Sequence, residues 1–479
     1  MKKFVRFLLA ALVVLVAVLL FNTLRFESKQ VAVDETPIPT LPDSALKHFQ
    51  QSITYKTISF GHDVKPDSVQ FVGFRRFLER TYPLVHSRLQ REIINYSLLF
   101  EWKGKNPHLK PVILMAHQDV VPIEPATQKL WEVDPFGGVV KEGYIWGRGT
   151  TDDKINVISL LESTERLLAK GFQPERTVYF VFGHDEEISG LNGALPIAQK
   201  MEKQGIKAEF IMDEGGIVTR NKVPGVSQPA ALIATAEKGY LSIELSAQIP
   251  GGHSSYPAKE TALDLITRAI VHLRENPPPQ RITPAMQGFF DHIGPEMPFM
   301  QKLIFANQWL TKPLLISIFG KTDQGDAMLR TTTAPTIIHS GIKDNVVPTV
   351  ATATVNFRIL PGEDSKQVLA HVKEAINDDR VKITVVGHIN EPSKVADVTC
   401  FGFQRIAKIA KQNFGGAITT PFLLIGATDS HHFANVSDNI LKFSPMIDPI
   451  GFHGVNERVS VESYQRALSF YENLLRSLN

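Results

Sequence analysis

The sequence predicts an α/β fold with a mostly parallel sheet, an inserted smaller domain and an N-terminal transmembrane segment. Three observations support this prediction. Short apolar strands alternate with helices from about residue 45, polar side chains follow several of these strands, and an apolar run occupies the N-terminus. Such alternation is typical of parallel sheets covered by helices. The chain has 479 residues, more than a single hydrophobic core usually accommodates.

Residues 1–26 are predicted to form a transmembrane segment. Two lysines and Arg6 flank an unbroken apolar run at 7–21, and residues 4–24 reach the roughly 20 residues that a bilayer requires. Bulky residues follow instead of a small-residue cleavage site, so an uncleaved anchor is favoured over a removed signal peptide. In either case the remaining chain lies outside the cytoplasm, and it is secreted if the segment is cleaved. A buried helix of the globular part is a further interpretation.

The composition narrows the range of partners and functions. Lysine and arginine number 51 against 49 acidic residues, a formal charge of +2 without a basic block, so no nucleic acid partner is expected. The only cysteine is Cys400, which excludes an intramolecular disulfide.

The main domain is predicted to be discontinuous, from residues 45–238 and 391–479, after a proline-containing linker at 27–44. Residues 239–390 are predicted to be the insert, because their strands and helices follow the βαββαβ order of a ferredoxin-like domain. Within the insert, residues 280–330 are rich in large apolar side chains. These side chains suit packing within the insert or a dimer contact at least as well as binding of an apolar acyl group.

Carboxylates and a histidine follow three predicted strands and begin one predicted helix. Because parallel strands gather ligands at their carboxyl ends, these side chains are expected to meet at one sheet edge. Each has an ordinary structural explanation when it is taken alone, but the set is typical of a two-metal hydrolytic site. The residues are His117, Asp119, Asp152, Glu186, Glu187, Asp213 and Glu214.

Chemistry suggests a role for each residue of this set. His117 can bind a metal, Asp119 can accept its other ring N–H, and Asp152 can bridge two ions. Glu187 can bind one ion and either Asp213 or Glu214 the other, which leaves Glu186 as the base that takes a proton from water. A second imidazole is needed, and the candidates are His431, His432 and His453.

Motifs at 115–122, 147–154, 183–187, 213–216 and 452–457 carry a resemblance to a known family. Over roughly residues 45–479 the chain resembles the di-zinc aminoacylase and carboxypeptidase family, which includes carnosinase, and most of all its carboxypeptidase S branch. The resemblance implies a site with two Zn²⁺ ions, for which Co²⁺ or Mn²⁺ can substitute. It implies His453 rather than His431 or His432 as the second imidazole. It keeps both Asp213 and Glu214 as candidate ligands, and it implies that Asp152 bridges and Glu186 is the general base.

The same resemblance implies that the insert is a lid and dimerisation domain. His253 would polarise the scissile carbonyl, often across a dimer, and Asn345 and Arg358 would hold substrate. A guanidinium suits this task because its fork binds both oxygens of a carboxylate. Without the resemblance, His253 and Arg358 are better explained as surface residues.

The expected function is therefore that of a zinc-dependent metallocarboxypeptidase or amidohydrolase. Its substrates would be short peptides or N-acyl amino acids with a free α-carboxylate beside the cleaved amide. A catalytically inactive, receptor-like ectodomain is the alternative, but such proteins usually lose ligands or the base, and all are present here. A di-metal phosphoesterase would require a glycine loop that cradles phosphate, and none is convincing.

Overall fold

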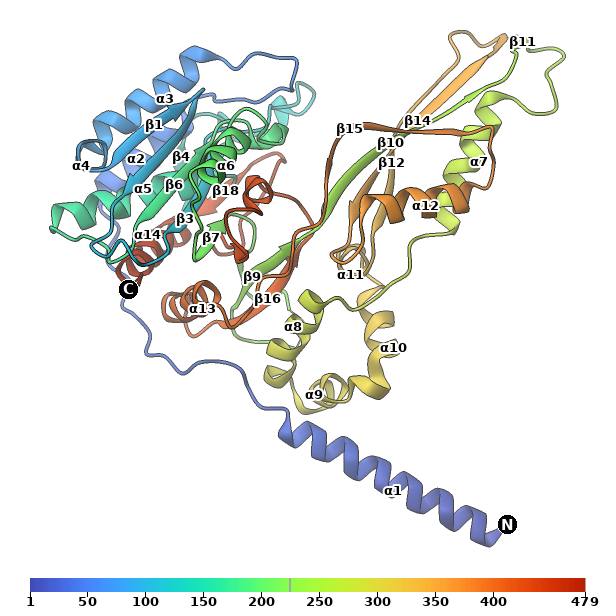
Figure 1. Cartoon of the computed structure of the whole chain (residues 1–479), viewed down its shortest axis with the longest axis horizontal. Helices are drawn as coiled ribbons and strands as arrows, with labels where there is room; N and C mark the ends of the chain where they lie inside the picture. Colours follow the sequence, from blue (N-terminus) through green and yellow to red (C-terminus); the bar gives the residue numbers. More distant parts are fainter. Residues whose placement is uncertain (224, 479) are drawn as a thin grey trace.

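A nine-stranded sheet forms the body of the main domain in the computed structural model, which describes residues 1–223 and 225–478 (Figure 1). The strands are β1 (Gln90–Ile94), β2 (Ser97–Trp102), β3 (Val112–His117), β6 (Val178–Gly183), β7 (Phe210–Asp213), β8 (Val218–Thr219), β9 (Ala230–Glu237), β16 (Ile418–Leu424) and β17 (Ile440–Lys442). Their order is β1-β2-β6-β3-β7-β17-β9-β16, and β8 pairs with β9. Strands β6, β3, β7 and β17 run parallel, which confirms the predicted parallel sheet where the polar residues lie.

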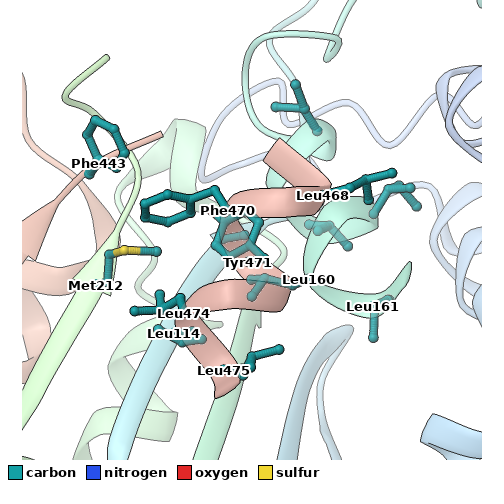
Figure 2. Packing of buried hydrophobic residues seen from close by; sticks show 14 of the residues in the cluster. Leu114, Leu160, Leu161, Met212, Phe443, Leu468, Phe470, Tyr471, Leu474 and Leu475 are labelled. Atoms are coloured by element: carbon teal, nitrogen blue, oxygen red, sulfur yellow. The ribbon is translucent and has the colours of Figure 1, made fainter. Parts of the chain in front are cut away.

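Helices cover both faces of this sheet. Alternate residues of β3 point to opposite faces, so Leu114 joins the core under one helical layer and Ile113 the core under the other. The first layer contains α2 (Asp43–Ile53), α3 (Ser68–Thr81), α4 (Pro83–Arg88), α5 (Lys154–Ala169), α13 (Phe401–Asn413) and α14 (Val461–Arg476). The second contains α6 (Ala194–Lys203) and the short helix η4 (Asp429–Phe433). Figure 2 shows Leu160 of α5 and Leu474 of α14 in the first core.

A small three-stranded sheet joins two distant parts of the main domain. Its order is β18-β5-β4, from β18 (Arg458–Ser460), β5 (Tyr144–Trp146) and β4 (Val139–Lys141). The antiparallel pairing of β18 with β5 places Arg458 opposite Trp146. The loop before β18 therefore lies beside the segment that follows β5, and each of these two stretches carries predicted metal ligands.

A separate four-stranded antiparallel sheet stands beside the main body (Figure 1). Its order is β12-β14-β10-β15, from β12 (Thr332–Ser340), β14 (Val350–Ile359), β10 (Gly239–Gln248) and β15 (Lys382–Asn390). Helices α7 (Ala262–Glu275) and α12 (Ser365–Ile376) pack on it, and the element order is the predicted βαββαβ. The domain limits at 239–390 and a lid or dimerisation role stay predictions.

Four helices interrupt the βαββαβ order between α7 and β12. They are α8 (Pro284–Ile293), α9 (Phe299–Ala306), α10 (Gln308–Phe319) and α11 (Asp323–Leu329). Phe289 and Phe290 of α8 share a core with Ile418 and Leu423 of β16. The apolar segment that stood out in the sequence is thus a helical cluster packed against the edge of the main sheet.

The N-terminal helix α1 (Lys2–Arg25) extends away from the rest of the molecule (Figure 1). It is long and apolar enough to cross a membrane, and its most apolar stretch is not buried against the protein. The residues between α1 and α2 lie against the main domain, because Gln30 bonds with Thr419 and the Thr36 N–H donates to the Gln412 carbonyl. The predicted linker therefore follows the surface of the body.

Candidate metal centre

The two oxygens of the Asp152 carboxylate face two different imidazoles. Oδ1 lies 2.8 Å from Nε2 of His117, and Oδ2 lies 2.9 Å from Nε2 of His453. A second carboxylate lies 3.2 Å from each of these Nε2 atoms, Glu214 beside His117 and Glu187 beside His453. The result is two groups of three ligand atoms that share Asp152, and the atoms of each group lie within 4.8 Å of one another.

The fold explains how these residues meet. His117 is the last residue of β3, and Glu214 follows β7, the parallel neighbour of β3. Glu187 lies in the short helix η2 (Glu186–Ile188) after β6, the neighbour on the other side of β3. Asp152 precedes α5, and His453 reaches it from the loop before β18. Adjacent parallel strands end at one sheet edge, as the sequence predicted.

Asp213 and Glu214 have different surroundings. Asp213 accepts hydrogen bonds from the backbone N–H groups of Ser430, at 2.9 Å, and of Glu214, at 3.0 Å. Glu214 instead places Oε1 beside His117 and belongs to a three-ligand group, which Asp213 does not join. The geometry favours Glu214 as the ligand.

Asp119 connects His117 to the short helix that carries Glu186. Its backbone carbonyl oxygen lies 3.0 Å from Nδ1 of His117 and its Oδ1 lies 3.3 Å from the same nitrogen, which leaves Nε2 of that ring facing Asp152. Its two oxygens also accept the backbone N–H groups of Glu186 and Glu187, both at 3.2 Å. Asp119 is fully buried, and hydrogen bonds from His117 contribute to a pKa below its usual value although burial opposes this. Glu186 places Oε2 4.0 Å from Nε2 of His117.

Burial and like charges make these carboxylates costly to ionise. Burial, with the Asp152 charge nearby, raises the pKa of Glu187 to about 7 and the pKa of Glu214 to about 8. Burial also raises the pKa of Glu186 well above its usual value. Hydrogen bonds to Asp152 and Glu187 raise the pKa of His453 to about 10. Several protons are therefore held where a cation could replace them.

The donor set fits divalent metal ions. Two imidazoles face three carboxylates, of which Asp152 is shared, and Oε1 of Glu187 is buried without a hydrogen-bond partner among the described residues. A buried carboxylate oxygen without a donor is costly unless a cation satisfies it. Nitrogen and carboxylate ligands without cysteine suit Zn²⁺ and other first-row metals.

A buried ion pair between Arg148 and Glu457 connects two loops of the site, which the sequence motifs did not reveal. Nη1 of Arg148 lies 2.5 Å from Oε2 of Glu457, and Oε1 of Glu457 accepts the backbone N–H groups of Gly149 and Thr151. Arg148 also donates to the backbone carbonyls of His453 and Gly454. Both residues belong to motifs identified in the sequence. They are 309 positions apart, so the spacing of the motifs did not predict that they form an ion pair.

The other late histidines do not join the ligand groups. Nδ1 of His431 lies 2.6 Å from the Thr428 carbonyl, and Nε2 of His432 lies 2.9 Å from the Ser189 carbonyl. Burial lowers the pKa of both rings to about 4, so both are neutral near pH 7. Of the three candidates, only His453 belongs to a three-ligand group.

Of the three predicted substrate contacts, Arg358 lies on the four-stranded sheet, whereas His253 and Asn345 lie in or beside a separate two-stranded sheet. His253 is exposed in the strand β11 (Gly252–His253), which pairs with β13 (Val346–Val347) next to Asn345. This pair of strands is beyond the outer end of the four-stranded sheet, far from β3 (Figure 1). Arg358 lies on β14, with its guanidinium 4.8 Å from the Tyr240 ring centre. Within one chain, the structure does not bring His253 and Asn345 to the metal ligands.

Comparisons with known proteins show what this chain is similar to. A family model described as peptidase family M20/M25/M40 matches residues 113–477. The chain is 39% identical over 482 residues to "Probable carboxypeptidase S-like 2" of Dictyostelium discoideum, which covers 97% of this chain and 92% of the relative. It is 37% identical over 483 residues to "N-fatty-acyl-amino acid synthase/hydrolase PM20D1" of Xenopus tropicalis, with 98% and 94% covered.

Solved structures share the fold at low sequence identity. An M20 family metallo-carboxypeptidase from Sulfolobus solfataricus superposes with a TM-score of 0.67 at 19% identity, over 91% of this chain and 99% of that chain. The di-peptidase Dug1p from Saccharomyces cerevisiae gives a TM-score of 0.62 at 15% identity, over 90% and 95%.

Proposed function

Because this chain belongs to peptidase family M20/M25/M40 and is therefore a hydrolase, we propose that it is a zinc-dependent amidohydrolase. Its substrates would be short peptides or N-acyl amino acids in which a free α-carboxylate lies next to the cleaved amide. The observation that carries the proposal is the Asp152 carboxylate, whose two oxygens each face one imidazole.

Two metal ions would share this carboxylate. His117 and Glu214 would hold one ion, and His453 and Glu187 the other, with Asp152 between them. Bound zinc lowers the pKa of water and polarises a carbonyl, and Co²⁺ or Mn²⁺ could replace it. The family is one of metallopeptidases, so metal dependence as such follows from membership, whereas the ion count and its identity belong to this proposal.

Glu186 would take the proton from the attacking water and return it to the leaving nitrogen. It lies 4.0 Å from Nε2 of His117, outside both ligand groups, and burial raises its pKa well above the usual value. A carboxylate with a raised pKa is a better base near neutral pH. Asp119 would position it, because it binds the backbone N–H of Glu186 and orients His117.

The four-stranded sheet would act as a lid and dimerisation domain, and a homodimer would complete the site. His253 would stabilise the developing oxyanion and Asn345 would hold substrate, both supplied by a second copy, since neither reaches the ligands of its own chain (Figure 1). Arg358 would bind the free carboxylate of the substrate. Burial lowers the pKa of Arg358, which shows that its guanidinium is partly shielded from water. A carboxylate bound there would be shielded too, and the contact would be stronger for that reason.

An apolar cavity supports N-acyl amino acids within this substrate class. It has a volume of about 750 Å³ and is lined by side chains such as Phe289, Phe305 and Leu315 of the helical cluster. Ile217 also lines it, only three residues after Glu214. Apolar pockets with few polar groups bind apolar chains well. The relatives named for N-fatty-acyl amino acids agree with an acyl substrate.

Hydrolysis profiling of the full chain in detergent micelles tests the proposal. Dipeptides, N-acyl amino acids and their C-terminal amides are compared before and after chelation, and after Zn²⁺ is restored. Release of free amino acid that stops with chelator and returns with Zn²⁺ is the expected result. Saturable substrate binding without turnover in the zinc-loaded protein would favour an inactive, receptor-like ectodomain. Full turnover in metal-free protein would remove the metal centre from the mechanism.

A further inference from the structure

Helices α9 and α10 expose large apolar side chains next to the end of α1. These are Phe299, Met300, Trp309, Leu310, Leu314 and Ile318, here called the apolar patch, and each is between 45 and 70% exposed. Leu310, Leu314 and Ile318 are spaced four residues apart and so form one stripe along α10. Contiguous exposed apolar side chains of this size usually mark a contact with a partner or a membrane.

The buried side chain of Asn307 fixes this patch to α1. Its Nδ2 donates to the Leu19 carbonyl at 3.1 Å and to the Thr23 hydroxyl at 3.3 Å, and its Oδ1 accepts from Asn22 at 3.0 Å. Asn307 is the residue between α9 and α10, and it is fully buried. The junction of the two helices therefore lies against the last two turns of α1.

This attachment sets the depth of the patch relative to a bilayer. A helix of 24 residues is about 36 Å long, slightly more than the roughly 30 Å of hydrocarbon in a bilayer. If α1 spans the membrane, Leu19 and Thr23 lie near its outer boundary, and Asn307 lies at the same level. The residues on either side of Asn307 then meet the layer where lipid headgroups and acyl chains join.

The chemistry of the two helices matches that layer. From 298 to 319 the sequence contains Lys302 and Lys312 and no acidic residue. Tryptophan is enriched where acyl chains meet headgroups, and lysine next to apolar residues favours anionic lipid. Ser28 and Lys29 also contact Glu296 and Asp291 of the same helical cluster, so the chain that leaves α1 remains tied to it.

We propose that the apolar patch of α9 and α10 is seated in the outer surface of the bilayer that α1 spans. The protein would then be held by one spanning helix and by a second, monotopic contact, which would fix the tilt of the main domain over the membrane. This inference goes beyond the proposed hydrolase activity and does not depend on it. It depends on α1 being retained as a membrane span.

Depth-dependent fluorescence quenching of the full chain tests this seating. Cys400→Ser removes the native thiol, and Met300→Cys introduces a site for an environment-sensitive nitrobenzoxadiazole label. Val69→Cys is the matched control, because Val69 is 74% exposed on α3, far from α1 (Figure 1). Both proteins are placed, one copy each, in nanodiscs of phosphatidylcholine and phosphatidylglycerol, with and without doxyl-labelled phospholipid. Leu310→Cys provides a second patch site if the first variant fails to fold.

The proposal predicts that a label at position 300 or 310 emits at shorter wavelength in nanodiscs and loses most of its emission to doxyl lipid. The label at position 69 should show neither change. Equal behaviour at patch and control positions would overturn the proposal. A shielded patch label that doxyl lipid cannot quench would place protein, such as a second copy, over the patch and would also overturn it. So would an intact mass showing that residues 1–25 have been removed.

Discussion

Arg148 and Glu457 form a buried ion pair that joins the two loops carrying Asp152 and His453. The guanidinium binds Glu457 on one side and the backbone carbonyl of His453 on the other, while Glu457 accepts backbone N–H groups just before Asp152. Neither side chain belongs to a ligand group. The pair can therefore act on the centre only by holding its ligands in position.

Glu457→Gln should weaken metal binding without removing a ligand. We expect zinc affinity to fall by about 10- to 100-fold, the range typical for loss of a group that orients ligands. Competition with a chromogenic chelator measures the affinity. Glu175→Gln is the control, because it alters the exposed Lys105–Glu175 pair and should change neither affinity nor activity. Unchanged zinc affinity in Glu457→Gln would leave the pair with a purely structural role.

Glu186→Gln and Glu187→Gln should separate catalysis from metal binding. Glu186→Gln should retain both ions and lose about 10²- to 10⁴-fold in kcat, because only the base is removed. Glu187→Gln should lose metal, since Oε2 of Glu187 faces His453. Metal content by mass spectrometry and turnover are measured on the same samples. If Glu186→Gln instead lost metal but kept full kcat per bound ion, Glu186 would be a metal ligand and not the base.

Asp213 and Glu214 can be separated in the same way. Glu214→Gln should lower zinc affinity by more than about 100-fold. This is more than is usually lost when a residue that only orients a metal ligand is changed. Asp213→Asn keeps an oxygen for the Ser430 N–H and should cost mainly thermal stability. Zinc titration and thermal unfolding distinguish the two effects. A larger affinity loss in Asp213→Asn would identify Asp213 as the ligand.

Zinc binding should strengthen as pH rises. The pKa of Glu187 is about 7, that of Glu214 about 8 and that of His453 about 10 without metal, so each holds a proton below its value. Binding must displace these protons, and the apparent affinity therefore increases from pH 6 to pH 8. Calorimetric titration in buffers of different ionisation enthalpy counts the released protons. Equal affinity across this window, without proton release, would contradict the raised pKa values.

Arg358→Ala should raise KM for substrates with a free carboxylate and leave their C-terminal amides nearly unchanged. The physical reason is that the variant loses the bidentate, charge-assisted hydrogen bonds between the guanidinium and the substrate carboxylate. Steady-state kinetics with matched acid and amide substrates provide the comparison. Tyr240→Phe serves as the control, because it keeps the ring beside the guanidinium and removes only the hydroxyl. Equal losses for both substrates in Arg358→Ala would exclude this role.

Much of the fold and the candidate site was predictable from local sequence patterns. The strand that ends at His117 and the helix that begins after Asp152 follow from apolar periodicity. The residues at the carboxyl ends of the central strands share an edge because these strands are parallel. Helices α8–α11 were not predicted, since an apolar segment alone does not reveal whether it packs inside or faces a partner.

Local sequence patterns were enough to identify the residue types of the centre and their order along parallel strands, because both depend on periodicity and strand ends. Long-range packing was needed to show which acidic neighbour faces His117, how Arg148 reaches Glu457, and where Asn307 meets α1. These contacts join residues far apart in the chain. Their geometry depends on side-chain direction and on the packing of separate elements, which no local pattern specifies.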